Sequence, residues 1–300
     1  MLRSLLVFVL SASSEALKVT VVGGTGFVGT RVCKILAEKG AEVTSVSKSG
    51  TAPSEPWASS VTWKAVDLLG DSAALDAAMG SPDAIVSCMG IIGTDEAALR
   101  AGNGAANENA FASAKRAGAS RSVLVSVASE VAACRDTFPG FFAGYFDGKE
   151  AAEKACAECV QDATRTTIVK PSFIYGGDEF GLLPPRVSAA YGSGVEELLS
   201  FGLIETIADA APGLIKVALR PPVSVDAVAG ACASAALGEL AEGAATRRAV
   251  GELDGTAAIK AAAGDPPATG LTDAIAWATE GVMKAADAAV AKVEEMTKEK

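Results

Sequence analysis

The sequence predicts an α/β fold in which helices cover a doubly wound parallel sheet, and two observations lead to that prediction. From residue 18 to about residue 127, short runs rich in β-branched residues alternate with longer runs that have helical spacing. The chain of 300 residues is 50% hydrophobic, so it can bury the core of one large domain or of two modest ones.

Six strands and two helices can be placed in order along this pattern. Each expected strand is a short run with Val, Ile or Thr, and each of the two clearest helices ends at a glycine, Gly40 or Gly118. The strands are expected at residues 18–23, 42–47, 61–67, 84–90, 122–128 and 166–171, and the helices at 30–40 and 107–118.

The segment from about 176 to 222 breaks the alternation. It is mixed and rich in Gly and Pro, so we expect a small cap on the substrate side of the sheet. From 189 to 222 its cations are Lys216 and Arg220 alone, and many of its residues are apolar. This composition favours an apolar substrate or a protein surface over a diphosphate.

The two ends of the chain differ from the domain expected at 17–250. Residues 1–16 combine one Arg, an apolar run and small residues, which is typical of a short cleavable signal sequence and too short to span a bilayer. An organelle presequence is the competing interpretation. Residues 251–272 are rich in Gly, Ala and Pro and are expected to be a linker. Residues 273–300 carry apolar residues seven apart and predict an amphipathic helix, which packs on its own domain or docks on a partner or membrane surface.

Composition shortens the list of possible chemistries. The chain has no His, so proton transfer must use Tyr, Lys, Asp, Glu or Cys, and no His-ligated metal site can form. A net charge of -10 without a long basic run argues against nucleic acid as the main partner. The six cysteines are expected to be reduced. Cys156 and Cys159 form a CxxC pair inside a helical run, where packing is favoured over a redox or metal role.

Glycines at the first strand-to-helix junction predict a dinucleotide site. Residues 19–32, VTVVGGTGFVGTRV, contain both G-x-G-x-x-G and G-x-x-G-x-x-G. Glycine permits a tight turn and a close approach to a pyrophosphate, and the helix N-terminus supplies N–H groups and partial positive charge. In an alternating β/α chain this pattern is typical of a Rossmann-like domain. The expected contacts at the turn are Gly23, Gly24, Thr25, Gly26, Phe27, Val28 and Gly29.

The end of the second strand is expected to select the dinucleotide. An NAD site normally has Asp or Glu there to accept from the ribose 2′-hydroxyl. Here the segment is Ser47-Lys48-Ser49, and a cation between two hydroxyls suits a 2′-phosphate, so NADP(H) is favoured over NAD(H); an exposed loop lysine is the alternative. Asp67, at the end of the third strand, is expected to face the adenine or to cap a helix. Further cofactor contacts are expected from Cys88, Gly90, Lys149 and Pro171.

Tyr145 and Lys149 form the candidate catalytic pair. They lie four residues apart, so on a helix they share one face. An ammonium near the phenol is expected to lower the pKa of Tyr145 and make it a usable acid or base, while Lys149 also reaches the nicotinamide ribose. Gly144 and Gly148 bracket the pair and weaken its helix by roughly 1 kcal/mol each relative to Ala, which predicts a less rigid site.

At these positions the chain resembles the extended and atypical short-chain dehydrogenase/reductases. The resemblance covers about residues 18 to 240. Within that superfamily the chain is most similar to organellar proteins related to the NADPH-binding accessory subunit of respiratory complex I, and to proteins linked with quinone metabolism in mitochondria and plastids. The resemblance implies cofactor binding and an organellar location, with catalysis in some relatives and a scaffold role in others. It rests on VVGGTGFVG, on Tyr145 with Lys149, and on VKPSFIYG, NGAANENA, GYFDGKEAAE and PPVSVDAVA.

The resemblance also implies a serine at the end of the fifth strand that polarises a substrate carbonyl. VLVSVASE offers Ser126 and Ser129, neither of them quite where the pattern places it. One interpretation is an NADPH-dependent oxidoreductase acting on an apolar carbonyl or quinone-like substrate. A second is a non-catalytic NADPH-binding subunit of an organellar membrane complex, and a third is a nucleotide-sugar epimerase or dehydratase.

Overall fold

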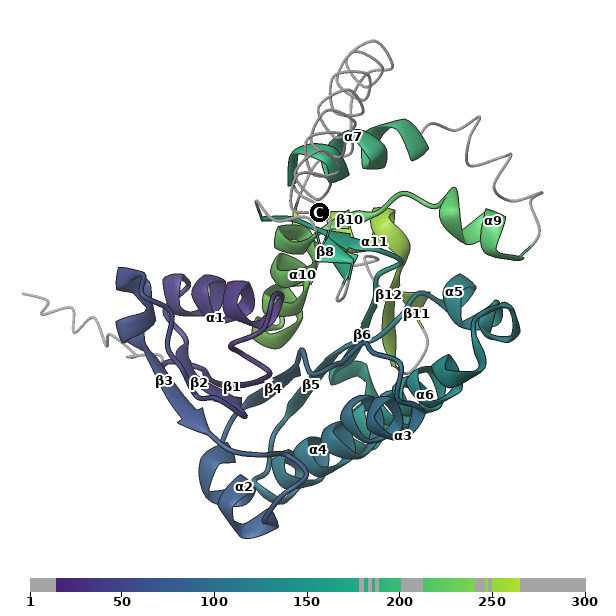
Figure 1. Ribbon diagram of the computed structural model, residues 1–300. Coiled ribbons are helices and arrows are strands. Elements are labelled where there is room, and N and C mark those ends of the chain that lie inside the picture. The colour runs from purple at the N-terminus through teal and green to yellow at the C-terminus, as the bar shows by residue number, and fades with distance from the viewer. Residues whose placement is uncertain are drawn as a thin grey trace, which may run out of the picture.

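A parallel sheet forms the centre of the structure, a computed structural model that describes residues 15–177, 181–182, 185–186, 189–200, 213–240, 246–247 and 250–264. In this part of the chain the main sheet has the order β11-β12-β6-β5-β4-β1-β2-β3, parallel throughout except for β11 at one edge (Figure 1). The order reverses direction at β1, as in a doubly wound fold. The predicted α/β class is therefore confirmed.

The six strands expected from the sequence are all present. They are β1 (Lys18–Val22), β2 (Glu42–Ser47), β3 (Val61–Ala65), β4 (Ala84–Ser87), β5 (Arg121–Val125) and β6 (Thr166–Lys170). Most of their residues are buried, because helices cover both faces of the sheet.

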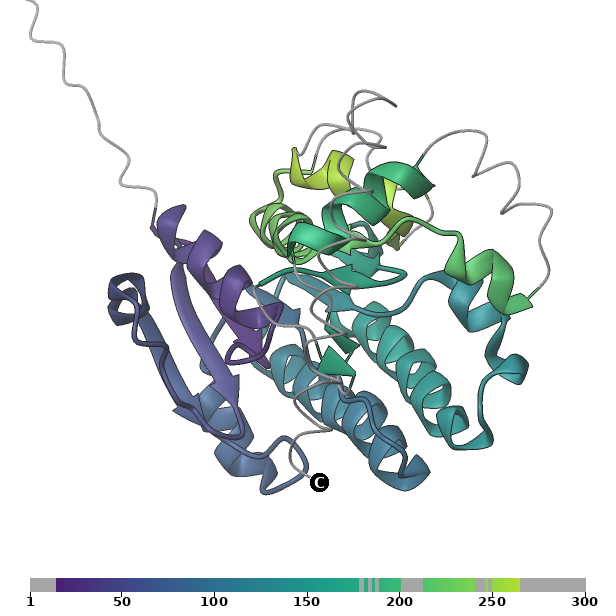
Figure 2. The same ribbon diagram turned by 45° about the horizontal axis from the view of Figure 1, so that its top comes forward.

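Two layers of helices pack on opposite faces of the sheet (Figure 2). One layer holds α1 (Gly29–Glu38), α10 (Val225–Leu237) and α11 (Gly255–Ala263), which share a hydrophobic core with the strands. The other holds α2 (Ser72–Met79), α3 (Glu96–Arg100), α4 (Ala106–Arg116) and α6 (Ala143–Cys159), with a second core beneath it. The two predicted helices correspond to α1 and α4, and Gly40 and Gly118 follow them with positive φ of 82° and 84°.

The segment expected to be a linker, 251–272, differs from that expectation in its first half. Residues Gly251–Asp254 form β12 beside β6, and Gly255–Ala263 form α11. Leu253 and Ile259 are fully buried, so this stretch belongs to the domain. The short strand β11 (Thr246–Arg247) pairs antiparallel with β12. The remainder of the expected linker, the expected helix at 273–300 and residues 1–14 lie outside the described residues.

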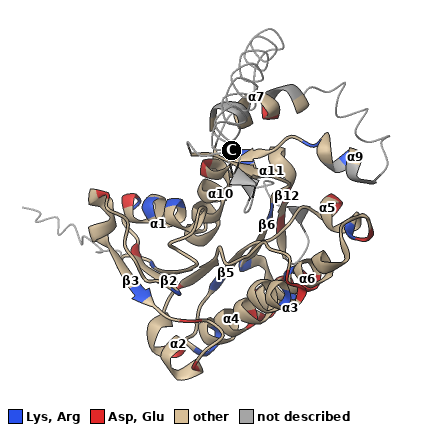
Figure 3. Cartoon of the chain, viewed as in Figure 1, with Lys and Arg blue, Asp and Glu red and all other residues tan. Residues whose placement is uncertain are grey.

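The described parts of the expected cap follow β6. They comprise β7 (Ile174–Tyr175), which pairs with β10 (Val223–Ser224), the hairpin of β8 (Gly181–Leu182) and β9 (Pro185–Arg186), and the helices α7 (Ala189–Leu199) and α9 (Gly213–Ala218). In the described residues no helix is both long and apolar enough to cross a membrane. Acidic and basic residues lie next to each other where α3 approaches α6 (Figure 3).

Candidate functional site

A cavity of about 980 Å³ lies where β1, β4, β5 and β6 end. Its lining includes residues of the glycine turn, of the segments after β4, β5 and β6, of α6, and of the cap helices α7 and α9. Ligands of doubly wound sheets bind at this carboxyl edge, near the point where the strand order reverses. The cavity therefore joins the predicted cofactor turn to the predicted catalytic pair.

The glycine turn has the shape of a cradle. Gly23 has φ of 75°, which favours glycine. A Cβ added at Gly24 would lie 2.2 Å from the Ser45 Oγ, and one at Gly29 would lie 2.2 Å from the Gly23 carbonyl oxygen, so α1 packs directly onto the turn. Gly26 lines the cavity, and an added Cβ there would meet only that carbonyl within 4 Å, at 3.1 Å. This open space in front of a helix N-terminus fits a pyrophosphate.

Some of the other predicted cofactor residues line the cavity, and the rest lie outside it. Phe27 and Val28 line the cavity with Gly26, whereas Thr25 does not. Further along the wall, the cavity is also lined by Cys88, Gly90, Lys149 and Pro171. The four residues predicted to hold the adenosine end, Ser47, Lys48, Ser49 and Asp67, lie outside the cavity at the carboxyl ends of β2 and β3.

Lys48 and Asp67 meet at the predicted adenosine end. The Lys48 Nζ lies 2.9 Å from the Asp67 Oδ2, although the Lys48 side chain is 84% exposed. Lys48 and then the Leu69 N–H, which donates to Asp67, hold the pKa of the Asp67 carboxyl below its usual value. Asp71 caps α2, so the helix-capping alternative for Asp67 is not what the structure shows. The hydroxyl oxygen of Ser47 accepts from the Gly50 N–H, and that of Ser49 accepts from the Thr51 N–H.

Tyr145 and Lys149 both line the cavity from α6, but their electrostatic relationship differs from the expected one. The Lys149 Nζ donates to the Val125 carbonyl oxygen at 3.0 Å and lies 5.9 Å from the centroid of the Tyr145 ring. Burial raises the pKa of Tyr145 to about 12, and burial also lowers the pKa of Lys149 to about 8. The expected lowering of the Tyr145 pKa by Lys149 is therefore wrong for this arrangement, because burial dominates and the net direction is upward.

Gly144 and Gly148 make the packing of α6 tighter, contrary to the expected loss of rigidity. An added Cβ at Gly144 would lie 2.1 Å from the Glu96 carbonyl oxygen, and one at Gly148 would lie 2.9 Å from the Asn103 Cβ. The missing side chains let α6 approach α3 and the π-helical turn Ala101–Ala105 closely. The two glycines thus lower helix propensity while allowing the close contact that positions α6, which carries the candidate pair.

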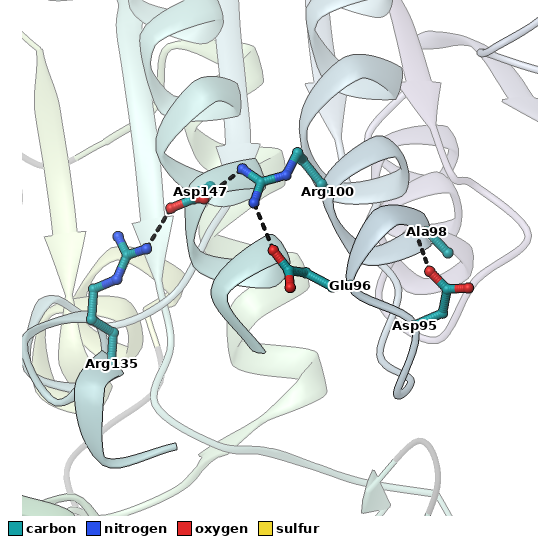
Figure 4. Close-up of polar contacts among 6 residues, drawn as sticks. All are labelled: Asp95, Glu96, Ala98, Arg100, Arg135 and Asp147. Atoms are coloured by element: carbon teal, nitrogen blue, oxygen red, sulfur yellow. Dashed lines mark hydrogen bonds and ion pairs between the residues drawn. The ribbon is translucent and has the colours of Figure 1, made fainter. Parts of the chain in front are cut away.

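An ionic clamp holds the outer side of the same helical turn (Figure 4). Asp147 lies between Tyr145 and Lys149 in the sequence and accepts hydrogen bonds from Arg100, at 2.5 Å, and from Arg135. Arg135 and then Arg100 hold the pKa of the Asp147 carboxyl below its usual value. Because these partners come from α3 and from the segment before α6, the clamp ties α6 to both of its neighbours.

Two buried asparagines that sequence reasoning missed support the wall of the cavity. Asn103 is 0% exposed and lines the cavity, and its amide binds both backbone groups of Ile91 at 3.1 and 3.0 Å. Asn107 accepts from the Ser87 hydroxyl and donates to the Met89 carbonyl oxygen. Together they fix the loop after β4. The signal was the unusual AGNGA run within a helical pattern, which forms a π-helical turn.

The two candidate serines lie in different places. Ser126 lines the cavity, is 5% exposed, and donates to the Glu153 Oε1 at 2.5 Å. Ser129 is exposed at the start of α5 (Ser129–Ala133) and outside the cavity lining, and its backbone N–H donates to Asp254. Sequence reasoning missed Glu153, although it continues the four-residue spacing of Tyr145 and Lys149 along α6.

The cap side of the cavity is mostly apolar. Both cations noted in the cap sequence are engaged by one carboxylate, since Arg220 binds Glu130 through two nitrogens and the Lys216 Nζ lies 3.5 Å from the same group. The apolar and aromatic lining includes Val131, Phe138, Phe142, Phe146, Phe173, Tyr175, Val195, Leu199 and Ala218.

The cysteines carry no sign of metal or redox chemistry in the described residues. All six are free thiols, and burial raises the pKa of both members of the CxxC pair, that of Cys159 to about 11. Both pack inside the second core. Across the described ranges, no group of three or more Cys, Asp or Glu side chains could hold a metal ion.

The sheet order and the glycine turn define the chain as a dinucleotide-binding α/β protein. The chain belongs to the NAD dependent epimerase/dehydratase family, whose match covers residues 19–198. A crystal structure of an epimerase-family protein from Burkholderia cenocepacia J2315 has a TM-score of 0.50 with 24% identity, covering 74% of this chain and 72% of that one. That likeness supports the fold alone.

Two curated relatives are similar over parts of the sequence. An uncharacterized chloroplastic protein of Arabidopsis thaliana is 37% identical over 171 residues, which are 55% of this chain and 53% of that protein. The MIOREX complex component 2 of Saccharomyces cerevisiae is 40% identical over 57 residues, which are 17% of this chain and 21% of that protein. This chain therefore spans about half of the first relative and about a fifth of the second.

Proposed function

We propose that the protein is an NADPH-dependent oxidoreductase that acts on an apolar carbonyl or quinone-like substrate. One observation carries the proposal: the glycine cradle, Lys149 and Tyr145 border a single cavity whose remaining lining is largely apolar. A cavity of about 980 Å³ has room for a nicotinamide and a substrate of moderate size. The bound nicotinamide would supply or accept a hydride at this place.

The side chains around the cavity have separate tasks in this proposal. Tyr145 holds a proton at its phenol oxygen, since its raised pKa keeps it protonated at neutral pH, and it donates to the substrate oxygen. Lys149 supports the ribose and holds the end of β5 through the Val125 carbonyl. The aromatic side chains of Phe138, Phe142 and Phe146 exclude water and pack against an apolar ring.

The preference for NADP(H) over NAD(H) is part of the proposal. Lys48 is the cation at the end of β2, with the hydroxyls of Ser47 and Ser49 beside it. A 2′-phosphate would compete with Asp67 for Lys48, since the two already form an exposed ion pair. The preference is therefore expected to be moderate.

Two alternatives are supported by different observations. A non-catalytic NADPH-binding subunit is supported by the raised pKa of Tyr145 and by the 5.9 Å between its ring centroid and the Lys149 Nζ, neither of which favours phenolate. An epimerase or dehydratase acting on a nucleotide sugar is supported by the family, but its diphosphate would have to displace Glu130 from Lys216 and Arg220.

An organellar location is supported by the chloroplastic relative and by the resemblance to organellar proteins.

NADPH oxidation by the purified protein tests the proposal. NADPH is offered with short-chain quinones, with aldehydes and, in a separate arm, with a nucleotide sugar under NAD⁺. Saturable NADPH oxidation with a quinone or aldehyde is the expected result. Tight NADPH binding without turnover in any arm would establish the scaffold alternative instead.

A further inference from the structure

The direction of the hydrogen bond made by the Ser126 hydroxyl determines which substrate groups Ser126 can bind. A hydroxyl has one hydrogen and two acceptor lone pairs. The Ser126 hydrogen is donated to the Glu153 Oε1 at 2.5 Å, so the part of the hydroxyl left for a ligand in the cavity is its acceptor side. The backbone at Ser126 is anchored to β6, because the Ser126 N–H donates to the Val169 carbonyl oxygen at 2.8 Å.

Glu153 is kept as an acceptor by its own partner. Its Oε2 lies 3.0 Å from the Lys170 Nζ, which also pairs with the Glu252 Oε1 at 3.2 Å. Burial alone would lower the pKa of Lys170, but Glu153 and then Glu252 outweigh it, and the net direction is upward. A carboxylate paired with an ammonium has no hydrogen to give, so Ser126 must be the donor of the Ser126–Glu153 bond.

We propose that Ser126, positioned by Glu153, is a hydrogen-bond acceptor that recognises the hydroxyl of an apolar alcohol, the reduced partner of the carbonyl. This inference rests on the proposed function, and it corrects the expectation that Ser126 polarises a carbonyl. A ketone oxygen only accepts hydrogen bonds. To donate to it, Ser126 would have to give up a charge-assisted bond to Glu153.

Tyr145 complements this acceptor in the same cavity. Its phenol is protonated and can donate to an alcohol or to a ketone, whereas Ser126 can accept only from an alcohol. An alcohol can therefore form hydrogen bonds with both Tyr145 and Ser126, whereas a ketone can form one with Tyr145 alone. Glu153 does not line the cavity, so it acts through Ser126 as a positioning residue.

A matched alcohol and ketone test the proposal without turnover. Dissociation constants of 9-fluorenol and 9-fluorenone are measured by equilibrium dialysis on the full chain, and the ratio of ketone to alcohol constants is the readout. The wild-type ratio is expected to be about tenfold, the worth of one hydrogen bond. Ser126→Ala should bring it near unity. Glu153→Gln should lower it as well, because the Gln amide can donate to Ser126 and release the hydroxyl toward a ketone.

Glu150→Gln is the control, since it removes the same charge from α6 at a side chain that is 82% exposed. It should leave the ratio unchanged. A wild-type ratio of one or less, binding of neither probe, or a ratio that survives Ser126→Ala overturns the proposal. If Glu153→Gln does not fold, Ser126→Ala decides alone. NADPH titration of the same proteins distinguishes a failure of the Ser126 role from a failure of the proposed function. If NADPH binds normally but the ketone-to-alcohol ratio does not change in Ser126→Ala, only the role of Ser126 is overturned.

Discussion

Lys149 and Val125 are joined across the floor of the cavity, where the Lys149 Nζ donates to the Val125 carbonyl oxygen at 3.0 Å. This bond ties α6 to the end of β5, and the same ammonium lies 5.9 Å from the centroid of the Tyr145 ring. Among the described residues, the buried Lys149 ammonium donates to this one carbonyl oxygen, and burial lowers its pKa to about 8. Stability should therefore depend on pH through this one group.

The first prediction concerns that dependence. Between pH 8 and 10.5 the unfolded chain holds the Lys149 proton and the folded chain releases it, so this group makes the folded state more stable as pH rises. The gain is on the order of 3 kcal/mol at most. Urea unfolding of wild type and Lys149→Met over this window should show a rise that the variant lacks. Above pH 10 the raised pKa of Tyr145 acts in the opposite direction, because the unfolded phenol ionises first.

The second prediction concerns the pair of Lys48 and Asp67. Asp67→Asn removes the carboxylate that competes for Lys48, so the ratio of NADH to NADPH dissociation constants should rise about fivefold, while Lys48→Glu should reverse the preference. Fluorescence titration with both cofactors measures the ratio. Asp76→Asn, which breaks an exposed pair with Arg116, is the control. An unchanged ratio in Lys48→Glu would sink the assignment to NADP(H).

The third prediction concerns Gly148. An Ala there places its Cβ 2.9 Å from the Asn103 Cβ and from the Gly104 nitrogen. Overpacking of this kind costs about 1–3 kcal/mol, which outweighs the roughly 1 kcal/mol gained in helix propensity. The net destabilisation should appear in urea unfolding, whereas Gly93→Ala, where an added Cβ meets nothing within 4 Å, should have little effect. A more stable Gly148→Ala would mean that α6 is free to shift.

Local patterns were enough to predict most of the sheet. β1 and β2 are runs of β-branched residues between clear breakers, and their burial on both faces is what such runs favour. β12 was not predicted, because its sequence GELD has one apolar residue, Leu253. Its strand conformation comes from pairing with β6. Tertiary pairing overrode a composition that is typical of a linker.

Sequence reasoning found those residues of the candidate site that lie close together in the sequence. The glycine turn and the Tyr145–Lys149 pair each occupy one local motif, and both border the cavity. The bond from Ser126 to Glu153 joins residues 27 apart, and the clamp on Asp147 draws on Arg100, 47 residues away. Contacts between residues so far apart in the sequence cannot be predicted from local residue spacing. The pKa of Tyr145 could not be predicted for the same reason, since burial sets it.

The fourth prediction follows from α11. Its Ile259 is 0% exposed, and the Lys260 Nζ lies 2.5 Å from the buried Glu196 of α7. Truncation after residue 254 should therefore destabilise the domain by more than the roughly 2–5 kcal/mol of one large core deletion, and NADPH affinity should fall with it. Truncation after residue 264 keeps every described contact of α11, and its Tm should stay near that of the full chain. Equal Tm values for the two truncations would contradict a core role for α11.

The last prediction asks whether the cavity performs chemistry. Tyr145→Phe removes one hydroxyl while its ring still packs against Phe142 and Phe146, so NADPH affinity should stay within about twofold of wild type. Turnover should fall at least about a hundredfold if the phenol is the proton donor. Lys149→Met should weaken both, because Lys149 borders the cavity and holds the end of β5.

The decisive comparison uses NADPH affinity, NADPH oxidation with quinones and aldehydes, and rescue of a null strain for both variants. Glu150→Gln is the control, since it changes an 82% exposed side chain of α6 outside the cavity lining and should leave all three readouts unchanged. Loss of turnover in Tyr145→Phe with normal cofactor affinity supports the enzyme. Full rescue of the strain by Tyr145→Phe, with rescue lost only in variants that no longer bind NADPH, would show that the cofactor serves the fold and that the protein acts as a scaffold.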